Sequence, residues 1–131
     1  MKTAAQKAIQ LLQDLISIPS FSSQEDQTAT RIEKWFEDHQ IPCKRSNNNV
    51  YAFNQFFDER KPTLLLNSHH DTVRPNKAYT RDPYQADIID GKLYGLGSND
   101  AGGALVSLLA LFTHFYAKIV YTFHLFIWRQ I

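Results

Sequence analysis

The continuous apolar run Leu64-Leu65-Leu66 constrains the fold of this chain more than any other feature. Between Thr63 and Asn67, this short run fits a central strand buried on both faces better than an edge strand. With the helical patterns described below, we expect an α/β domain with a mixed sheet and flanking helices.

Two segments before this run have the pattern of amphipathic helices. In residues 3–17, apolar side chains recur at steps of three and four residues, and this helix is expected to stop before Pro19. The second helix is expected to start near Ser23, which forms with Asp26 a weaker relative of the Ser-x-x-Glu capping box. It is expected to end near His39.

The remaining elements are predicted from turn residues. Strand-like runs at residues 42–45 and 50–53 flank an asparagine-rich turn, and Asn tolerates left-handed backbone conformations, so the pattern predicts a hairpin. Asp90-Gly91 is the strongest short signal for a second hairpin. Residues 102–112 then form a predicted helix that is entered through glycines.

Composition excludes several classes of protein. With 131 residues, 44% of them apolar, the chain can bury one modest core in a single domain. The 14 basic and 13 acidic residues leave a net charge of +1 without a basic block, which argues against a nucleic-acid partner. Cys43 is the single cysteine, and the N-terminal segment is too polar for a signal peptide. We therefore expect a cytoplasmic protein.

The last thirty-one positions differ from the rest of the chain. All 13 acidic residues lie between Asp14 and Asp100, and only Lys118 and Arg129 carry fixed charges after that point. This segment also holds a high density of aromatic residues. Gly, Ser, Thr, His and Lys residues interrupt it, so we do not expect it to span a membrane.

The first candidate site follows directly after the Leu64–Leu66 run. His69 and Asp71 are two positions apart and can point to the same side of an extended segment, which suits a metal ligand and its carboxylate partner. The alternative interpretation is a solvated polar loop, because two neighbouring histidines, His69 and His70, are a weak signal.

The second candidate site is the glycine-dense loop at residues 91–103. It lacks the Gly-Lys-Ser/Thr ending and the glycine spacing of phosphate-binding loops, and Asp100 would repel phosphate. A carboxylate in this position instead favours a cation, and Asp100 could bridge two metal ions. The alternative role for Asp100 is an N-cap of the following helix.

Three segments of the chain resemble sequence motifs of one protein family, and they occur in the same order as in that family. Residues 15–20, 64–73 and 90–103 are similar to the opening turn and the two metal motifs of the di-zinc amidohydrolases and exopeptidases. This family includes acetylornithine deacetylase, succinyl-diaminopimelate desuccinylase, aminoacylase and carboxypeptidase G. The resemblance covers roughly residues 5–117. It implies that residues 1–117 are the N-terminal part of a zinc-exopeptidase-like catalytic domain, incomplete in this chain.

The resemblance also implies roles for individual residues. His69 would be a ligand of one zinc ion, Asp71 the catalytic carboxylate that orients it, and Asp100 the carboxylate that bridges both ions. Zn²⁺ would be the cofactor, two ions in the complete site, with Co²⁺ as a substitute. His70 would be the intervening residue and not a ligand.

Residues 67–73 and 101–103 most resemble the acetylornithine deacetylase branch. This implies hydrolysis of a small N-acyl amino acid, with release of acetate and ornithine, as in arginine biosynthesis. Complete members are often homodimers. Many members have an Arg before the second glycine and a Lys after the bridging Asp, whereas this chain has Leu96 and Gly102 in that neighbourhood.

The chain lacks the rest of the family site. The family's general base is a Glu in a Glu-Glu pair, yet nothing acidic follows Asp100, and neither His114 nor His124 occupies an expected ligand position. We therefore expect this chain alone to be inactive. The alternative function is a non-catalytic fragment that binds at most one metal weakly or associates through its apolar tail.

Residues 118–131 are predicted to be an atypical apolar tail created by a change of reading frame. The alternative is an authentic short protein with a strand-forming C-terminus. Translation of the coding DNA in all three frames separates these possibilities, because a Glu-Glu pair in another frame would identify an interrupted deacylase.

Overall fold

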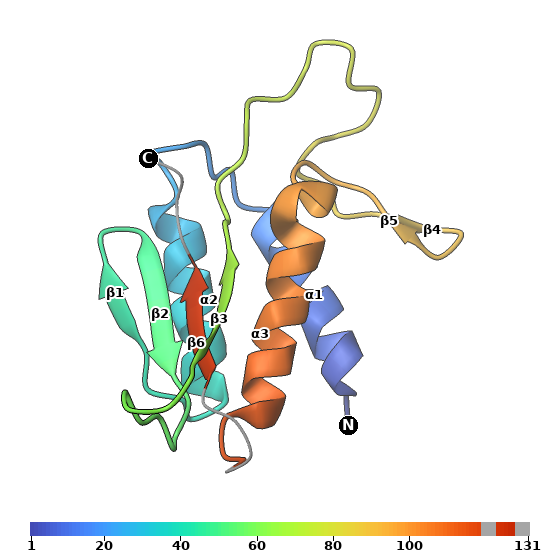
Figure 1. Ribbon diagram of the computed structural model, residues 1–131. Coiled ribbons are helices and arrows are strands. Elements are labelled where there is room, and N and C mark those ends of the chain that lie inside the picture. The colour runs from blue at the N-terminus through green and yellow to red at the C-terminus, as the bar shows by residue number, and fades with distance from the viewer. Residues whose placement is uncertain (119–122, 128–131) are drawn as a thin grey trace.

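The computed structural model describes residues 1–118 and 123–127. Its main layer is a four-stranded sheet with three helices beside it, and a small hairpin projects from the far side of the helices (Figure 1). The helices are α1 (Ala4–Ile16), α2 (Asp26–Asp38) and α3 (Gly103–Phe115), and the strands are β1 (Lys44–Ser46), β2 (Asn49–Phe53), β3 (Leu64–Ser68), β4 (Ile88–Ile89), β5 (Lys92–Leu93) and β6 (Phe123–Ile127). The expected α/β fold and both predicted hairpins are confirmed.

The large sheet is mixed and has the order β1-β2-β6-β3. β6 runs antiparallel to β2 and parallel to β3. Val50 of β2 and Ser68 of β3 both pair with Ile127, so these two buried side chains lie on the same face of the sheet. α2 packs against β2, and α3 packs against β3 and β6. The helices therefore cover the face that carries Val50 and Ser68.

The prediction that the Leu64–Leu66 run is a central strand buried on both faces is wrong. β3 is one of the two edge strands of the described sheet, and Leu64 and Leu65 are each 54% exposed. Leu66 is buried because it points toward α3, whereas Leu65 points to the opposite face. The helices in the described part of the chain pack on one face only, which explains why the apolar run is half exposed.

The helix boundaries agree with the predicted ranges, but the caps differ. Thr3 caps α1 in a full capping box with Gln6. The predicted cap of α2 is wrong, because its N-cap is Glu25 and not Ser23. Ser23 has a φ of +76°, so the chain is still turning two residues before the N-cap Glu25.

The core lies between the helices and the covered face of the sheet. The rings of Phe36 and Phe112 join α2 to α3, with centroids 6.1 Å apart in an edge-to-face arrangement. Apolar side chains from all three helices and the sheet surround them and are fully or nearly fully buried: Leu11, Ile32, Val50, Leu66, Leu105 and Leu109. This packing fixes the helix ends from which the candidate site is built.

Part of the predicted apolar tail lies outside the described residues, namely 119–122 and 128–131. The described part of the tail forms β6, which lies between β2 and β3. Within residues 1–118 and 123–127, the model contains no helix with the length and apolar character that crossing a membrane requires.

Leu109 provides a test of the core. Leu109→Ala should lower the free energy of unfolding by about 2–5 kcal/mol, because it removes a fully buried side chain from α3 and leaves a cavity. Leu111→Ala on the same helix is the control, since Leu111 is 40% exposed and its loss should cost far less. Urea unfolding followed by circular dichroism measures both, and equal losses would contradict the assigned core.

Candidate metal centre

The first arm of the site is the segment that leaves the carboxyl end of β3. Its backbone is fastened to the turn after α1, because the Thr72 amide donates to the Ser20 carbonyl at 2.7 Å. The buried Ser20 hydroxyl donates in turn to the His70 carbonyl at 3.0 Å. These contacts hold residues 69–71 against the turn that precedes α2.

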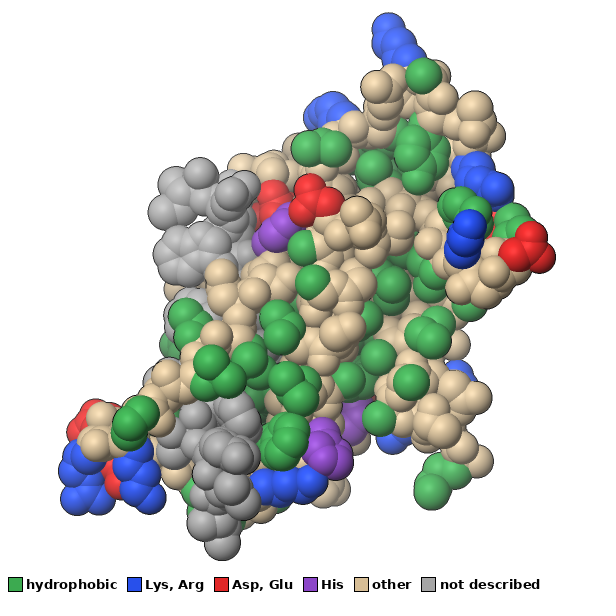
Figure 2. Space-filling view, turned by 45° about the vertical axis from the view of Figure 1, so that its right-hand side comes forward, with side chains coloured by type: hydrophobic (Ala, Val, Ile, Leu, Met, Phe, Trp, Pro, Cys, Tyr) green, Lys and Arg blue, Asp and Glu red, His purple; other side chains and the backbone are tan. Residues whose placement is uncertain are grey.

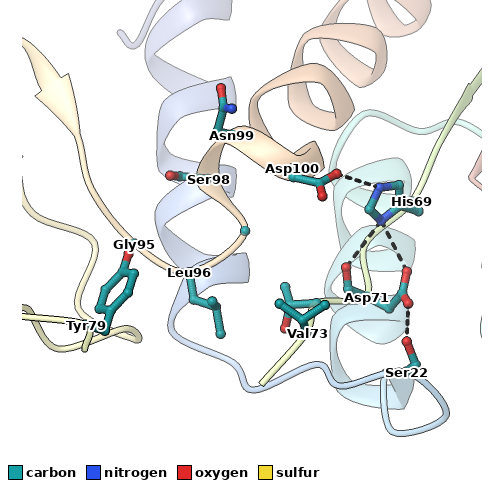
Figure 3. A pocket seen from close by; sticks show the side chains of 12 residues that line it. Ser22, His69, Asp71, Val73, Tyr79, Gly95, Leu96, Ser98, Asn99 and Asp100 are labelled. Atoms are coloured by element: carbon teal, nitrogen blue, oxygen red, sulfur yellow. Dashed lines mark hydrogen bonds and ion pairs between the residues drawn. The ribbon is translucent and has the colours of Figure 1, made fainter. Parts of the chain in front are cut away.

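Within this segment, His69 lies between two carboxylates (Figure 3). Its Nδ1 is 3.2 Å from both the backbone oxygen and the Oδ1 of Asp71, and its Nε2 is 3.1 Å from Oδ1 of Asp100. The other carboxylate oxygen of Asp71 accepts a hydrogen bond from the Ser22 hydroxyl. The Ser22 hydroxyl therefore holds the Asp71 carboxylate while Oδ1 contacts His69.

The second arm carries Asp100 on a wide, kinked turn, η1 (Ser98–Gly102). Asp100 has φ −129° and ψ 93°, and its peptide bond to Ala101 is cis. Gly97, at φ +75°, lies so close to Thr72 that a Cβ atom would be 2.6 Å from its Cγ2. Because glycine permits this approach, the turn reaches the His69 segment. Asp100 is not the N-cap of α3, since that position belongs to Gly102.

A cavity of about 520 Å³ opens beside these two arms. Asp71, His69 and Asp100 form one part of its wall, and Tyr79 and Leu96 lie across from them (Figure 3). The side chain of Asp100 is 89% exposed, whereas that of Asp71 is only 11% exposed. Figure 2 shows one place where acidic side chains and a histidine lie together on the surface.

His70 points the other way, into the protein. It is 6% exposed, its Nδ1 is 2.7 Å from the Thr28 hydroxyl, and its Nε2 is 2.9 Å from the Asn48 backbone oxygen. Burial lowers the pKa of His70, which favours the neutral ring. Both ring nitrogens thus have protein partners, as expected for a residue that is not a ligand.

The hydrogen-bond partners of His69 favour a metal ion between its Nε2 atom and the carboxylate of Asp100. Both partners of Nδ1 are oxygens of Asp71, so Nδ1 carries a hydrogen, and in the neutral ring Nε2 then has a lone pair. That lone pair faces a carboxylate oxygen of Asp100, so two acceptors meet at 3.1 Å. A metal ion placed between these two atoms would be bound by both of them. An imidazole nitrogen and a carboxylate oxygen are donors that Zn²⁺ accepts.

His69 and Asp100 are the types of residue that bind zinc, but two ligands are too few to complete a zinc site. Zinc takes about four ligands, and His69 and Asp100 supply two. Among the residues that the structure describes, no group of three or more His, Cys, Asp or Glu side chains is placed to hold a metal ion. His114 does not contribute, because it lies near the end of α3 with its Nε2 2.6 Å from the Lys118 ammonium.

Comparison with known proteins identifies the family to which the chain belongs. The sequence model described as peptidase family M20/M25/M40 matches residues 65–129. Acetylornithine deacetylase of Shigella sonnei is 33% identical over an alignment of 124 residues, which covers 83% of this chain and 32% of that protein. The chain belongs to peptidase family M20/M25/M40.

Solved M20 structures share the fold. The M20 metallo-carboxypeptidase Sso-CP2 of Sulfolobus solfataricus has a TM-score of 0.72 and 24% identity, over 97% of this chain and 30% of that one. The YXEP protein of Bacillus subtilis, described as a dinuclear metal binding peptidase from the M20 family, has a TM-score of 0.68 and 20% identity, over 95% of this chain and 35% of that one. This M20 chain therefore spans about a third of the length of these relatives.

The structure brings Asp100 together with His69 and Asp71, although His69 and Asp100 are 31 positions apart in the sequence. The sequence analysis missed Ser22 and Tyr79. Ser22 lies 49 positions from Asp71, so no local pattern links the two. Tyr79 is on the long loop between β3 and β4, where turn residues give no sign of a cavity wall.

Gly97 tests the close approach of the two arms. Gly91→Ala should cost about 1–2 kcal/mol in stability, because φ is +75° there and nothing lies within 4 Å of the added Cβ. Gly97→Ala has the same φ and adds a clash with Thr72, so it should cost clearly more. Urea unfolding of both variants measures the difference, and equal costs would show that the close approach is relaxed in solution.

Proposed function

We propose that this chain is part of a metal-dependent M20 amidohydrolase that acts on small N-acyl amino acids. The observation that carries the proposal is the meeting of His69 Nε2 and Asp100 Oδ1 at 3.1 Å on the wall of an open cavity. The 33% identity to an acetylornithine deacetylase supports N-acetylornithine as the substrate, with acetate and ornithine as products.

In this proposal, His69 and Asp100 hold zinc, with cobalt as a substitute. When bound, such a metal polarises an amide carbonyl as a Lewis acid. Asp71 acts on His69 rather than on the substrate, because its backbone oxygen accepts from Nδ1–H while its carboxylate oxygen Oδ1 lies 3.2 Å from the same nitrogen, and this would leave the lone pair of Nε2 for a metal ion. Ser22 in turn fixes the second oxygen of Asp71.

The cavity suits a small substrate with both polar and apolar parts. Tyr79 and Leu96 form its apolar side, and Val73 lies between that side and the carboxylates. An acyl group or an aliphatic side chain can pack there while the amide faces His69 and Asp100. This division of the wall is typical of small-molecule sites, where a few polar groups orient a ligand that is otherwise in apolar contact.

We infer that the 131-residue chain alone does not complete the reaction. Proton transfer requires a general base, and no Asp or Glu follows Asp100 in the sequence. The absence of a three-donor group in the described part of the chain supports the second candidate, a fragment that binds one metal weakly. The charge and cysteine content support a cytoplasmic location, and the complete enzyme would be a homodimer.

Cobalt titration tests the metal site. The chain should bind Co²⁺ with a change in visible absorption, and His69→Ala or Asp100→Asn should weaken binding more than about tenfold, because each removes a donor. His114→Ala is the matched control and should bind as the parent does, since His114 lies outside the cavity. Equal binding by the parent and His69→Ala would refute the assigned ligands.

An activity assay separates the two candidate functions. The purified chain is incubated with N-acetylornithine and zinc or cobalt, and ornithine release is measured. No release is expected from the fragment. Release that a chelator abolishes and His69→Ala removes would show instead that the chain is a complete catalyst.

A further inference from the structure

The geometry around His70 points to a role in setting the direction of the two neighbouring site residues. We propose that His70 is a positioning residue, which anchors the segment from inside the protein so that His69 and Asp71 face the cavity. This inference rests on the proposed metal-binding function of His69, and it adds His70 and Thr28 to the residues on which that site depends.

His70 is held by two elements that are distant in the sequence. The Thr28 hydroxyl on α2 is 2.7 Å from Nδ1, and the Asn48 backbone oxygen in the β1–β2 turn is 2.9 Å from Nε2. Thr28 is only 1% exposed and His70 only 6%. In such a buried site, a ring that lost one partner would leave an unsatisfied polar atom, which keeps the ring in one orientation.

The hydrogen positions follow from these partners. The Asn48 carbonyl can only accept, so Nε2 carries the hydrogen, and Nδ1 of the neutral ring must accept from the Thr28 hydroxyl. That hydroxyl is also placed to donate to the Glu25 carbonyl, 3.0 Å away. Its single hydrogen can serve only one of the two acceptors, and when it serves Nδ1 of the neutral His70 ring, the Glu25 carbonyl still accepts from the Ala29 amide at 3.0 Å.

An inward His70 determines where its neighbours point. In an extended segment, successive side chains alternate between opposite sides, so anchoring His70 on one side places His69 and Asp71 together on the other. The Ser20 hydroxyl bound to the His70 carbonyl prevents the segment from rotating. The separation of His69 and Asp71 by one residue is therefore useful only because that residue is fixed.

Thr28→Val tests this role without altering the site itself, because valine keeps the shape of threonine and removes the hydrogen bond to Nδ1. We expect the affinity for Co²⁺ to fall about tenfold, as is usual when a partner outside the ligand shell is lost. We also expect the χ1 angles of His69 and Asp71, read from three-bond couplings, to change from one rotamer to an average.

Two further variants separate positioning from general stability. Thr28→Ser restores the hydroxyl and should restore the parent affinity and rotamers. Thr30→Val removes a hydroxyl from the exposed side of the same helix, where Thr30 bonds to Asp26 and Arg45, and should change neither readout. Circular dichroism confirms that each variant is folded at the temperature of the measurement.

The outcomes are distinct. Parent-like affinity and rotamers in folded Thr28→Val would overturn the positioning role. If Thr28→Val does not fold, ¹⁵N-histidine spectra of the parent decide, because a hydrogen on Nδ1 of His70, or a mixture of tautomers, would overturn the proposal. If the parent itself binds no Co²⁺, the proposed metal function fails, and the rotamers alone decide whether His70 positions its neighbours.

Discussion

The close approach between the segment after β3 and the turn before α3 is the constraint on which the site depends. These segments belong to different layers, and they meet because Gly97 lies against Thr72. A side chain larger than hydrogen at Gly97 would separate them. Asp100 would then move away from His69, and the cavity would lose the wall on which two donors converge.

The core and the site are connected through the same helices. Phe36 and Phe112 join α2 to α3, so the helix that carries Thr28 and the helix that follows Asp100 are fixed relative to each other. His70 then links α2 to the segment after β3. The stability of the core thereby contributes to the geometry of the ligands, although no core side chain belongs to the site.

The sequence predicts elements whose signals are local. The steps of three and four residues give the helices, the asparagine turn gives the β1–β2 hairpin, and the two motifs single out His69 and Asp100. Properties that depend on partners distant in the chain could not be predicted. Leu65 is exposed because no described helix covers its face, and Ser22 approaches Asp71 only through the tertiary fold.

The position of β6 has a consequence for how the sheet assembles. In the described part of the chain, β2 and β3 do not pair with each other, and each pairs with β6, the last of the described strands. A ribosome therefore releases the other three strands before the one that joins them. The helices and the β1–β2 hairpin involve local contacts and can form early, whereas the sheet must wait for the closure of long loops. Until then, the newly made chain exposes two strand edges that can pair with other molecules.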